Sequence, residues 1–235
     1  MIDREALALR LDAVRGRIGR AARAVGRDPA EVSLLAVTKT WPAEVVEVAY
    51  GLGLRDFGEN YAAEVCAKAE ALRGLEGIRW HFIGHLQRNK ARSVAGVAHA
   101  VQSVDSVRLA EALGERAAEA GRSLGCWVQV NVGGEAQKSG CAPGEAAAVA
   151  AAVEGQRALR LEGLMTVPPH TDDPAGAGVF FAALVALRES LGGGARLPGL
   201  SMGMTHDLEV AVAAGATVVR VGSALFGDRG VGRGG

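Results

Sequence analysis

Lys39 is the residue in this sequence whose position most directly indicates covalent chemistry. It follows an apolar stretch, VSLLAVT over residues 32–38, which predicts a buried strand. A lysine held among apolar walls loses the solvation of its charged form, which lowers its pKa, and the neutral amine can attack a carbonyl carbon to form a Schiff base. The alternative is a lysine that caps a strand and extends its ammonium group to water. Position alone leaves both open.

Lysine is scarce in this chain, which narrows the search for such an amine. Of the 26 basic residues, four are lysines and 22 are arginines. Lys68 lies in a polar helical stretch and is expected to be a solvated charge. Lys90, within QRNKAR, is expected on a helix surface, with a phosphate contact as the alternative. Lys138 follows a predicted strand and could face the same opening as Lys39.

Two segments near the end of the chain have the composition of an anion-binding site. SMGMTHD begins at Ser201 and places Gly203 before a helix, and VRVGSALFG places Gly222 and Ser223 before another short helix. Backbone N–H groups at helix starts, together with small hydroxyls, bind phosphate without a net positive charge. The simpler interpretation is an ordinary turn with a helix cap, which explains either segment alone.

Arg220 lies inside the last apolar strand, just before Gly222. An unpaired buried charge is costly, so this guanidinium needs a partner. The partner is either a carboxylate or a nitrogen atom of a ligand, and the sequence does not decide between them.

Other apparent motifs fail on spacing. GGEAQKSG has Gln137 where a phosphate-binding P-loop requires glycine, and the GLG at 51–53 precedes a strand, whereas a dinucleotide fingerprint follows one. His81 and His85 lie on a strand and its exit, a spacing that does not bring two metal ligands together. The three cysteines form no CxxC pair, so neither a zinc site nor a disulfide framework is indicated. We therefore predict no metal.

The composition argues against several classes of protein. The 235 residues carry 26 basic and 26 acidic side chains, and a net charge of zero argues against a nucleic-acid-binding face. The first residues mix acids and arginines at helical spacing without an apolar signal core, and no run of about 18 apolar residues predicts a membrane span. A reducing cytoplasm is the expected compartment, and neither nucleic acid nor a membrane is an expected partner.

The elements that must position these groups alternate between strand and helix. After an opening helix, the pattern predicts a parallel sheet with helical cover. The predicted strands cover residues 32–38, 54–57, 79–83, 98–103, 126–132, 161–166, 197–201 and 217–221. Such units in about 200 residues fit a closed (β/α)8 TIM barrel, and an open doubly wound sheet is the alternative. In a barrel, function lies at the carboxyl ends of the strands, where Lys39, Arg220 and the glycine-rich segments fall.

Boundaries and turns complete this prediction. No linker divides the chain, so residues 1–235 are expected to form one domain, with the barrel over about 30–227 and a disordered tail over 228–235. The three glycines at 192–194 are expected to end a helix. Asp105 is expected to cap the helix that follows it.

Together, these segments resemble the pyridoxal phosphate homeostasis protein family. The blocks that carry the resemblance are AVTKT, FGENY, WHFIGHLQRNK, VNVGGEAQKSG, GLMTVPP, SMGMTHD and VRVGSALFG, in that order over about residues 30–227. WHFIGHLQRNK and the SMGM block are highly specific. The family is similar to the barrel domain of alanine racemase and of bacterial-type ornithine decarboxylase, without their second, β-rich domain.

The resemblance implies a role for each site residue. Lys39 would hold pyridoxal 5′-phosphate as an aldimine, Arg220 would approach the pyridine nitrogen, and Lys138 would serve as a transient secondary lysine. The other residues would surround the phosphate and the ring: Ser201, Gly222 and Ser223 at the phosphate, Met202 and Gly203 shaping that wall, and Asn60 and His81 beside the ring. Thr205 stands where the family usually has serine, which keeps a hydroxyl at that position.

The resemblance also implies a function without catalysis. Racemases of this fold use a second base, a tyrosine from their second domain, whereas Tyr50 and Tyr61 here lie in or at the start of predicted helices. The expected role is to hold pyridoxal phosphate in the cell and to release it or deliver it to apoenzymes. The alternatives are a weak amino-acid racemase and a barrel that binds another phosphorylated metabolite without a Schiff base. A monomer is expected, because the domain that completes the racemase dimer is missing.

Overall fold

The computed structural model describes residues 2–135 and 137–227. Within this range, eight parallel strands close into a barrel in which each strand pairs with the next and β8 pairs with β1. The strands are β1 (Ser33–Val37), β2 (Asp56–Glu59), β3 (Arg79–Phe82), β4 (Ala100–Val104), β5 (Leu124–Gln129), β6 (Leu159–Met165), β7 (Gly199–Ser201) and β8 (Val218–Val221). The predicted (β/α)8 TIM barrel is confirmed, and the alternative of an open doubly wound sheet is wrong.

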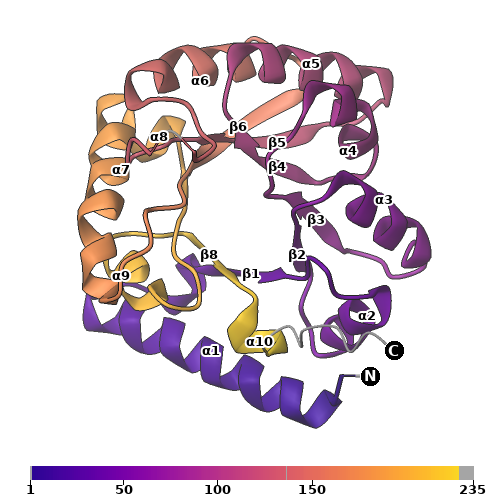
Figure 1. Ribbon diagram of the computed structural model, residues 1–235, viewed down its shortest axis with the longest axis vertical. Helices are drawn as coiled ribbons and strands as arrows, with labels where there is room; N and C mark the ends of the chain where they lie inside the picture. Colours follow the sequence, from indigo (N-terminus) through magenta and orange to yellow (C-terminus); the bar gives the residue numbers. More distant parts are fainter. Residues whose placement is uncertain (1, 136, 228–235) are drawn as a thin grey trace.

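Helices surround the ring of strands (Figure 1). The α-helices are α1 (Arg4–Ala24), α2 (Ala43–Gly51), α3 (Ala62–Ala71), α4 (Ala91–Val97), α5 (Val107–Glu119), α6 (Ala146–Glu154), α7 (Gly178–Ser190), α8 (Gly193–Arg196), α9 (Leu208–Ala213) and α10 (Ser223–Phe226). Short 3-10 helices are η1 (Pro29–Glu31), η2 (Arg88–Lys90), η3 (Pro143–Glu145) and η4 (Pro174–Ala177). Among the helices of the described ranges, none is long and apolar enough to cross a membrane.

The expected N-terminal helix is α1, which packs against α9 and α10 (Figure 1). It begins after Asp3, whose carboxylate accepts a hydrogen bond from the backbone N–H of Glu5 at 2.9 Å. Leu7, Leu11 and Ile18 recur on one face and are at most 4% exposed. Burial of each such side chain stabilises the fold by about 1.5–3 kcal/mol, which attaches α1 beside the last barrel unit.

β2 lies two residues later in the chain than predicted. Leu54 is buried ahead of the strand, and this explains the apolar signal that placed the prediction too early. The strand includes Gly58 and Glu59, and Gly58 pairs in register with His81 of β3. A Cβ atom at Gly58 would approach the side chain of Leu35 to 3.3 Å, so this part of the barrel favours glycine.

Two other boundaries differ for identifiable reasons. β5 ends at Gln129, earlier than predicted, because the Asn131 N–H then donates to the Cys141 carbonyl at 2.9 Å and the chain leaves the sheet. The prediction that Asp105 caps α5 is wrong. Ser106 has the extended backbone of an N-cap, and its hydroxyl accepts from the Leu109 N–H at 3.3 Å. The Asp105 carboxylate instead lies 3.7 Å from the His85 ring.

The predicted glycine stop at 192–194 is confirmed at Gly192. This residue follows Leu191, the C-cap of α7, and has a φ of +112°, in the left-handed region that favours glycine. Gly193 then begins the short α8, which was not predicted. The predicted disordered tail, residues 228–235, lies outside the described residues.

Candidate functional site

A cavity of about 430 Å³ opens at the carboxyl end of the barrel. Its lining comes from segments that follow β1, β2, β3, β6, β7 and β8, which are the strand ends where barrels carry their sites. Its polar side includes Lys39, Asn60, Thr205, Arg220, Gly222 and Ser223. Its apolar side includes Trp41, Ile83 and Val167. The closed barrel therefore brings together an amine, a guanidinium and two small hydroxyls that are distant in sequence.

Lys39 follows the end of β1 by two residues and lines this cavity. Lys39 is the only lysine among the described residues that line the cavity. The preceding residue is held to the barrel, because the Thr38 N–H donates to the Gly58 carbonyl at 3.0 Å and the Thr38 hydroxyl donates to Glu59 Oε1 at 2.6 Å. The amine is thus carried by a segment that is anchored to the neighbouring strand.

The segments after β7 and β8 form another part of the lining, and β8 pairs directly with β1. The Ser223 hydroxyl lies 3.2 Å from the Thr205 hydroxyl, and the Ala224 N–H donates to Thr205 Oγ1 at 3.4 Å. Gly203 has a φ of +90°, and a Cβ atom there would collide with Ala211 in α9. This glycine is required for the chain to turn between β7 and α9. The result is a wall of hydroxyls and helix-start amides, which suits an anion.

Arg220 is 4% exposed and reaches the floor of the cavity from β8. One of its amino groups donates to Ser201 Oγ at 2.7 Å, and the other donates to the Thr166 carbonyl at 2.8 Å. Burial lowers its pKa to about 10, and the charge of Asp207 opposes this shift. Of the two partners left open by the sequence, no carboxylate bonds this guanidinium within the described part of the chain, and its direct partners are neutral oxygens.

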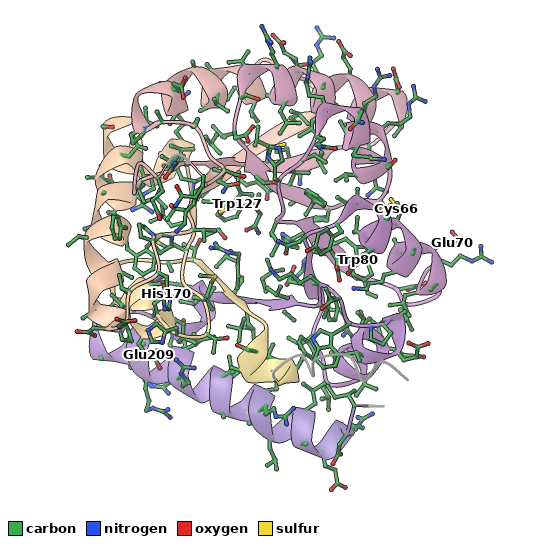
Figure 2. All side chains as sticks on the ribbon, viewed as in Figure 1. Cys66, Glu70, Trp80, Trp127, His170 and Glu209 are labelled. Carbon is green, nitrogen blue, oxygen red and sulfur yellow. The ribbon has the colours of Figure 1, made fainter. Side chains whose placement is uncertain are left out.

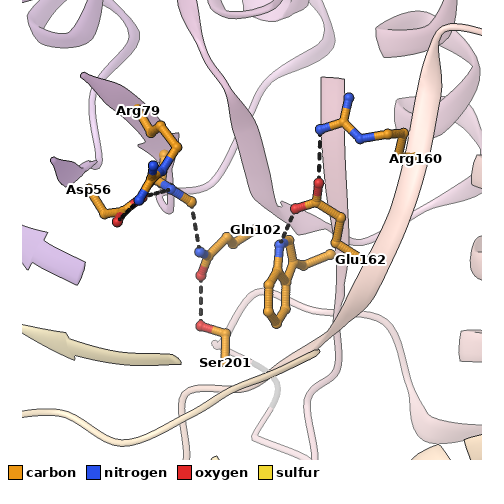
Figure 3. A network of polar contacts seen from close by, with 8 residues as sticks. Asp56, Arg79, Gln102, Arg160, Glu162 and Ser201 are labelled. Carbon is orange, nitrogen blue, oxygen red and sulfur yellow. Dashed lines mark hydrogen bonds and ion pairs between the residues drawn. The ribbon is translucent and has the colours of Figure 1, made fainter. Parts of the chain in front are cut away.

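Arg220 donates to Ser201, and from Ser201 a chain of hydrogen bonds continues through the barrel interior to Asp56 (Figure 3). The Ser201 hydroxyl donates to Gln102 Oε1 at 2.6 Å, Gln102 Nε2 lies 3.1 Å from His81 Nδ1, and His81 Nε2 lies 3.1 Å from Asp56 Oδ1. A guanidinium can only donate, so the Ser201 hydroxyl oxygen accepts a hydrogen bond from Arg220. The Ser201 O–H then donates to Gln102. The Gln102 amide then donates to His81, and the imidazole tautomer that fits carries its proton on Nε2. The direction of every bond follows from Arg220.

The far end of this chain is an ion pair at the opposite end of the barrel. Arg79 donates from Nε to Asp56 Oδ1 at 2.6 Å and from its terminal nitrogen to Oδ2 at 2.5 Å. Burial raises the pKa of Asp56, but hydrogen bonds from His81 and Arg79 outweigh burial and lower it to about 2. Polar groups therefore extend from the cavity at one end of the barrel to the surface at the other.

The structure brings some of the predicted site residues together and leaves others outside the cavity lining. Lys39, Asn60, Arg220, Gly222 and Ser223 line the cavity. Three predicted residues are not in this lining: Ser201 and Met202 are fully buried, and His81 lies inside the barrel. Gly203 supports this wall through its backbone, since its carbonyl accepts from the Arg220 N–H at 2.9 Å.

Lys138 lies beside the cavity and not in its lining. Its ammonium donates to the Pro168 carbonyl at 2.7 Å and pairs with Glu135 at 2.7 Å. Pro168 directly follows Val167, which does line the cavity. No group of three or more histidine, cysteine, aspartate or glutamate side chains that could hold a metal ion occurs among the described residues.

The expectation that Lys68 is a solvated charge is wrong. Lys68 is 5% exposed, and its ammonium lies 2.6 Å from Glu59 Oε1 and 2.8 Å from the Thr38 carbonyl. The physical reason is that α3 turns this face toward the ends of β1 and β2, where a carboxylate and a carbonyl are already buried. Glu64 lies one helical turn before Lys68 in α3, and this spacing of opposite charges is the feature of the sequence that indicates an ion pair for Lys68.

Comparison with known proteins places this geometry in a family. The model of the alanine racemase N-terminal domain matches residues 9–230. A pyridoxal phosphate homeostasis protein of Pseudomonas aeruginosa is 49% identical over 216 residues, which cover 92% of this chain and 93% of that protein. The chain belongs to the pyridoxal phosphate homeostasis protein family. A protein of the same name from Aquifex aeolicus is 39% identical over 222 residues, with coverage of 94% and 97%.

Solved structures agree with this family assignment. PipY of Synechococcus elongatus with PLP bound has a TM-score of 0.81 and 35% identity, covering 94% of this chain and 100% of that chain. An alanine racemase of Streptomyces coelicolor has a TM-score of 0.73 over 97% of this chain and 59% of its own, with 20% identity. The racemase likeness shows the fold, and the homeostasis protein family is shown by the sequences.

Sequence reasoning missed Gln102, the link between the two halves of the polar chain. It is fully buried in β4, within AVQSV. A lone amide inside an otherwise apolar strand needs a partner, because an unsatisfied buried amide is costly. That signal was available, but the identity of its partners, Ser201 and His81, depends on the closure of the barrel.

Proposed function

We propose that this protein binds pyridoxal 5′-phosphate in the cavity at the carboxyl end of the barrel, holds it covalently on Lys39, and releases it or delivers it to apoenzymes. The single observation that carries this proposal is that Lys39, Arg220 and the hydroxyl wall of Thr205 and Ser223 line one cavity. PipY, a solved relative, has PLP bound. The volume of about 430 Å³ lies in the range of small-molecule sites.

The residues present fit this cofactor group by group. A phosphate ester matches the Thr205 and Ser223 hydroxyls and the backbone at Gly222, where α10 begins. Asn60 contributes a buried Oδ1 atom that has no hydrogen-bond partner among the described residues. A hydroxyl on the ring would satisfy that acceptor. The Ser201 hydroxyl is engaged by Arg220 and Gln102, so we assign it to the support of Arg220 and not to the phosphate.

Lys39 supplies the covalent attachment. Its neutral amine adds to the aldehyde carbon, one water leaves, and a carbon–nitrogen double bond replaces the carbonyl, with no change of oxidation state. Water or a competing amine reverses the step. A reversible bond suits a protein that must hold a reactive aldehyde and later release it.

Arg220 weakens this cofactor as a catalyst. A guanidinium does not give up its proton to the ring nitrogen, and a cofactor whose ring nitrogen is uncharged is a weaker electron sink. Tyr50 donates its hydroxyl to the Glu76 carbonyl at 2.9 Å, and Tyr61 is 54% exposed at the start of α3. Neither is in the cavity lining, so no tyrosine of the described residues is placed as a second base. We therefore infer a binding protein and not an enzyme.

The test is reductive trapping of the covalent complex. Added pyridoxal phosphate should give a visible absorbance band that borohydride removes, with the label recovered by mass spectrometry on Lys39. Lys39→Ala should lose the band, whereas the control Lys90→Ala, in the exposed η2, should keep it. A label on another lysine in Lys39→Ala would overturn the assignment. Phosphate-dependent protection of the Gly222 segment without a visible band would favour another phosphorylated metabolite.

A second experiment separates the carrier from a weak racemase. The protein loaded with pyridoxal phosphate is incubated with L-alanine in deuterated water, and the exchange of the α-hydrogen is followed. We expect no exchange above that of free pyridoxal phosphate. Exchange at enzyme-like rates would establish the racemase alternative. The rate at which an apoenzyme gains pyridoxal phosphate is then compared across a dialysis membrane and in a direct mixture. Equal rates indicate release into solution, and a faster rate in the mixture indicates direct delivery.

We also propose a cytoplasmic location and a monomeric state. Cys66, Cys126 and Cys141 are free thiols, and burial raises the pKa of Cys141 to about 12. Three separated thiols that form no disulfide suit a reducing compartment. Cell fractionation tests the location, and light scattering coupled to size-exclusion chromatography tests the monomer.

A further inference from the structure

The segment that carries Lys39 is a tight turn whose two sides are both bound by α3. The Trp41 N–H donates to the Thr38 carbonyl at 3.1 Å, so Lys39 and Thr40 are the two central residues of the turn. Two α3 side chains one helical turn apart, Glu64 and Lys68, contact the residues on either side of Lys39. Both contacts join residues far apart in sequence.

Lys68 binds the residue before Lys39. Its ammonium donates to the Thr38 carbonyl at 2.8 Å and to Glu59 Oε1 at 2.6 Å. The same Glu59 oxygen accepts the Thr38 hydroxyl at 2.6 Å. The ammonium is nearly buried and the carboxylate is fully buried, so solvent does not screen these contacts. The Thr38 backbone and side chain are therefore fixed by one ion pair.

Glu64 binds the residue after Lys39. Thr40 has a φ of +67°, a conformation that β-branched residues rarely adopt and for which this turn position favours glycine. The Thr40 N–H donates to Glu64 Oε2 at 2.7 Å, and the same oxygen lies 3.3 Å from the Lys68 ammonium. Glu64 thus stabilises a strained backbone that would otherwise relax and carry Lys39 with it.

We propose that Glu64 and Lys68 are positioning residues for Lys39, which fix the backbone on both of its sides so that the amine meets the aldehyde in a preset geometry. This inference rests on the proposed function of Lys39. The two side chains act on the backbone beside Lys39, Lys68 through the Thr38 carbonyl and Glu64 through the Thr40 N–H. Its effect is to leave only the side-chain torsions of Lys39 to be ordered on binding, which reduces the entropic cost of the covalent step.

A purely structural role for these residues makes a different prediction. If Glu64 only attached α3 to the barrel, its removal would lower stability and leave the affinity for pyridoxal phosphate unchanged. Glu64 is a suitable probe because its side chain is 30% exposed, so the variant is expected to fold. Glu70 is the matched control in the same helix. It is 72% exposed, pairs with Arg73, and lies at the outer edge of the molecule (Figure 2).

The experiment compares Glu64→Ala, Glu64→Gln and Glu70→Ala with the unaltered chain. The dissociation constant for pyridoxal phosphate, the rate of borohydride-trapped attachment to Lys39, and amide hydrogen exchange of residues 39–41 are measured for each. Glu64→Ala should weaken binding about 5- to 30-fold and accelerate exchange at the Thr40 amide. Glu64→Gln keeps an acceptor oxygen and should recover most of this loss. Glu70→Ala should match the unaltered chain.

The outcomes distinguish this inference from the proposed function. If the unaltered chain takes no label on Lys39, the proposed function fails. If it is labelled and Glu64→Ala binds as tightly as Glu70→Ala, the positioning role is wrong. If Glu64→Ala and Glu70→Ala weaken binding equally, the effect belongs to α3 as a whole and the inference is likewise overturned.

The Lys68 side is tested by the double variant Lys68→Met with Glu59→Gln. Removing both charges avoids leaving a buried carboxylate without its cation, so the fold is retained. We expect faster exchange of residues 38–41 and an affinity about 5- to 30-fold lower than that of the unaltered chain. An unchanged affinity in a variant with faster exchange would contradict the role of Lys68.

Discussion

Two buried cations lie near the cavity, and the structure treats them in opposite ways. Lys68 is 5% exposed and faces the Glu59 carboxylate, with Glu64 beside it. Arg220 is 4% exposed and donates to the Ser201 hydroxyl and the Thr166 carbonyl. One positive charge is neutralised inside the protein, and the other is solvated by neutral oxygens.

The difference separates support of the fold from binding. The charge of Lys68 is already compensated by a buried carboxylate, so Lys68 does not attract a charged ligand and instead holds segments of the chain together. The charge of a cation that bonds only neutral groups is not compensated, so Arg220 can attract a ligand atom that carries a lone pair or a negative charge. Removal of Lys68 should therefore affect folding first, and removal of Arg220 should affect binding first.

The largest expected effect is the loss of the Lys68 charge. Lys68→Met leaves the Glu59 carboxylate buried without its cation, and the free energy of unfolding should fall by about 3–5 kcal/mol. Urea unfolding followed by circular dichroism measures this. Lys90→Met, in the exposed η2, is the control and should change stability by less than about 0.5 kcal/mol. Equal stability of the two variants would show that the Lys68 pair is dispensable.

Removal of Arg220 should give the reverse pattern. Arg220→Met should weaken pyridoxal phosphate binding about 10- to 100-fold, because a charge-assisted hydrogen bond to the ligand is lost. The cost to the fold should be smaller than for Lys68→Met, since no buried carboxylate is left behind. Absorbance titration and urea unfolding are run in parallel. The control is Arg160→Met, which removes a half-exposed arginine of β6 that pairs with Glu162 outside the cavity lining (Figure 3).

The polar chain below Arg220 should make stability depend on acid. The pKa of Asp56 is about 2 in the folded protein against an ordinary value of 3.8, so the unfolded chain binds this proton more tightly. The stabilisation is fully present above about pH 4 and is lost as the pH falls through about 2. Its size is about 1–2 kcal/mol after allowance for solvent screening.

Stability measured between pH 5 and 2 tests this dependence. Asp56→Asn should flatten the curve in that window, whereas Asp172→Asn, at an exposed site, should leave it unchanged. An Asp56→Asn curve that parallels the unaltered chain would show that Asp56 does not carry the acid dependence.

The smallest expected effect concerns the link between Arg220 and the chain below. Ser201→Ala removes the acceptor of one Arg220 amino group and the donor to Gln102, and should cost about 1 kcal/mol of stability. Ser190→Ala, at an exposed hydroxyl near the end of α7, is the control and should have almost no effect. If the two variants are equally stable, Arg220 is held by the Thr166 carbonyl alone.

Much of the cavity lining is readable from the sequence because parallel strands point their carboxyl ends the same way. Lys39 and Gly222 each follow a strand that the apolar pattern predicts, and the barrel closes β8 onto β1. The two residues therefore line one cavity although 183 positions separate them in the chain. Arg220 was identified for a different reason, as a charge inside an apolar strand.

The sequence does not indicate how deep within the barrel a side chain lies. Ser201 and His81 have the residue types of ligand-binding groups, yet the register of their strands places both outside the cavity lining. Lys68 was misjudged because a helix face that looks polar is buried only if another element supplies carboxylates for it, and Glu59 comes from a different strand. Side-chain partners across the barrel are set by stagger between strands, which no local pattern reports.

The closed ring of strands determines the route by which the cavity exchanges its contents. Because β8 pairs with β1, the barrel has no unpaired strand edge at which its wall could open without breaking hydrogen bonds. Entry and departure then occur through the mouth, between the segments that follow the strands, while the hydrogen-bonded ring stays intact. Turnover of the bound molecule is then set by short surface segments and not by unfolding of the scaffold.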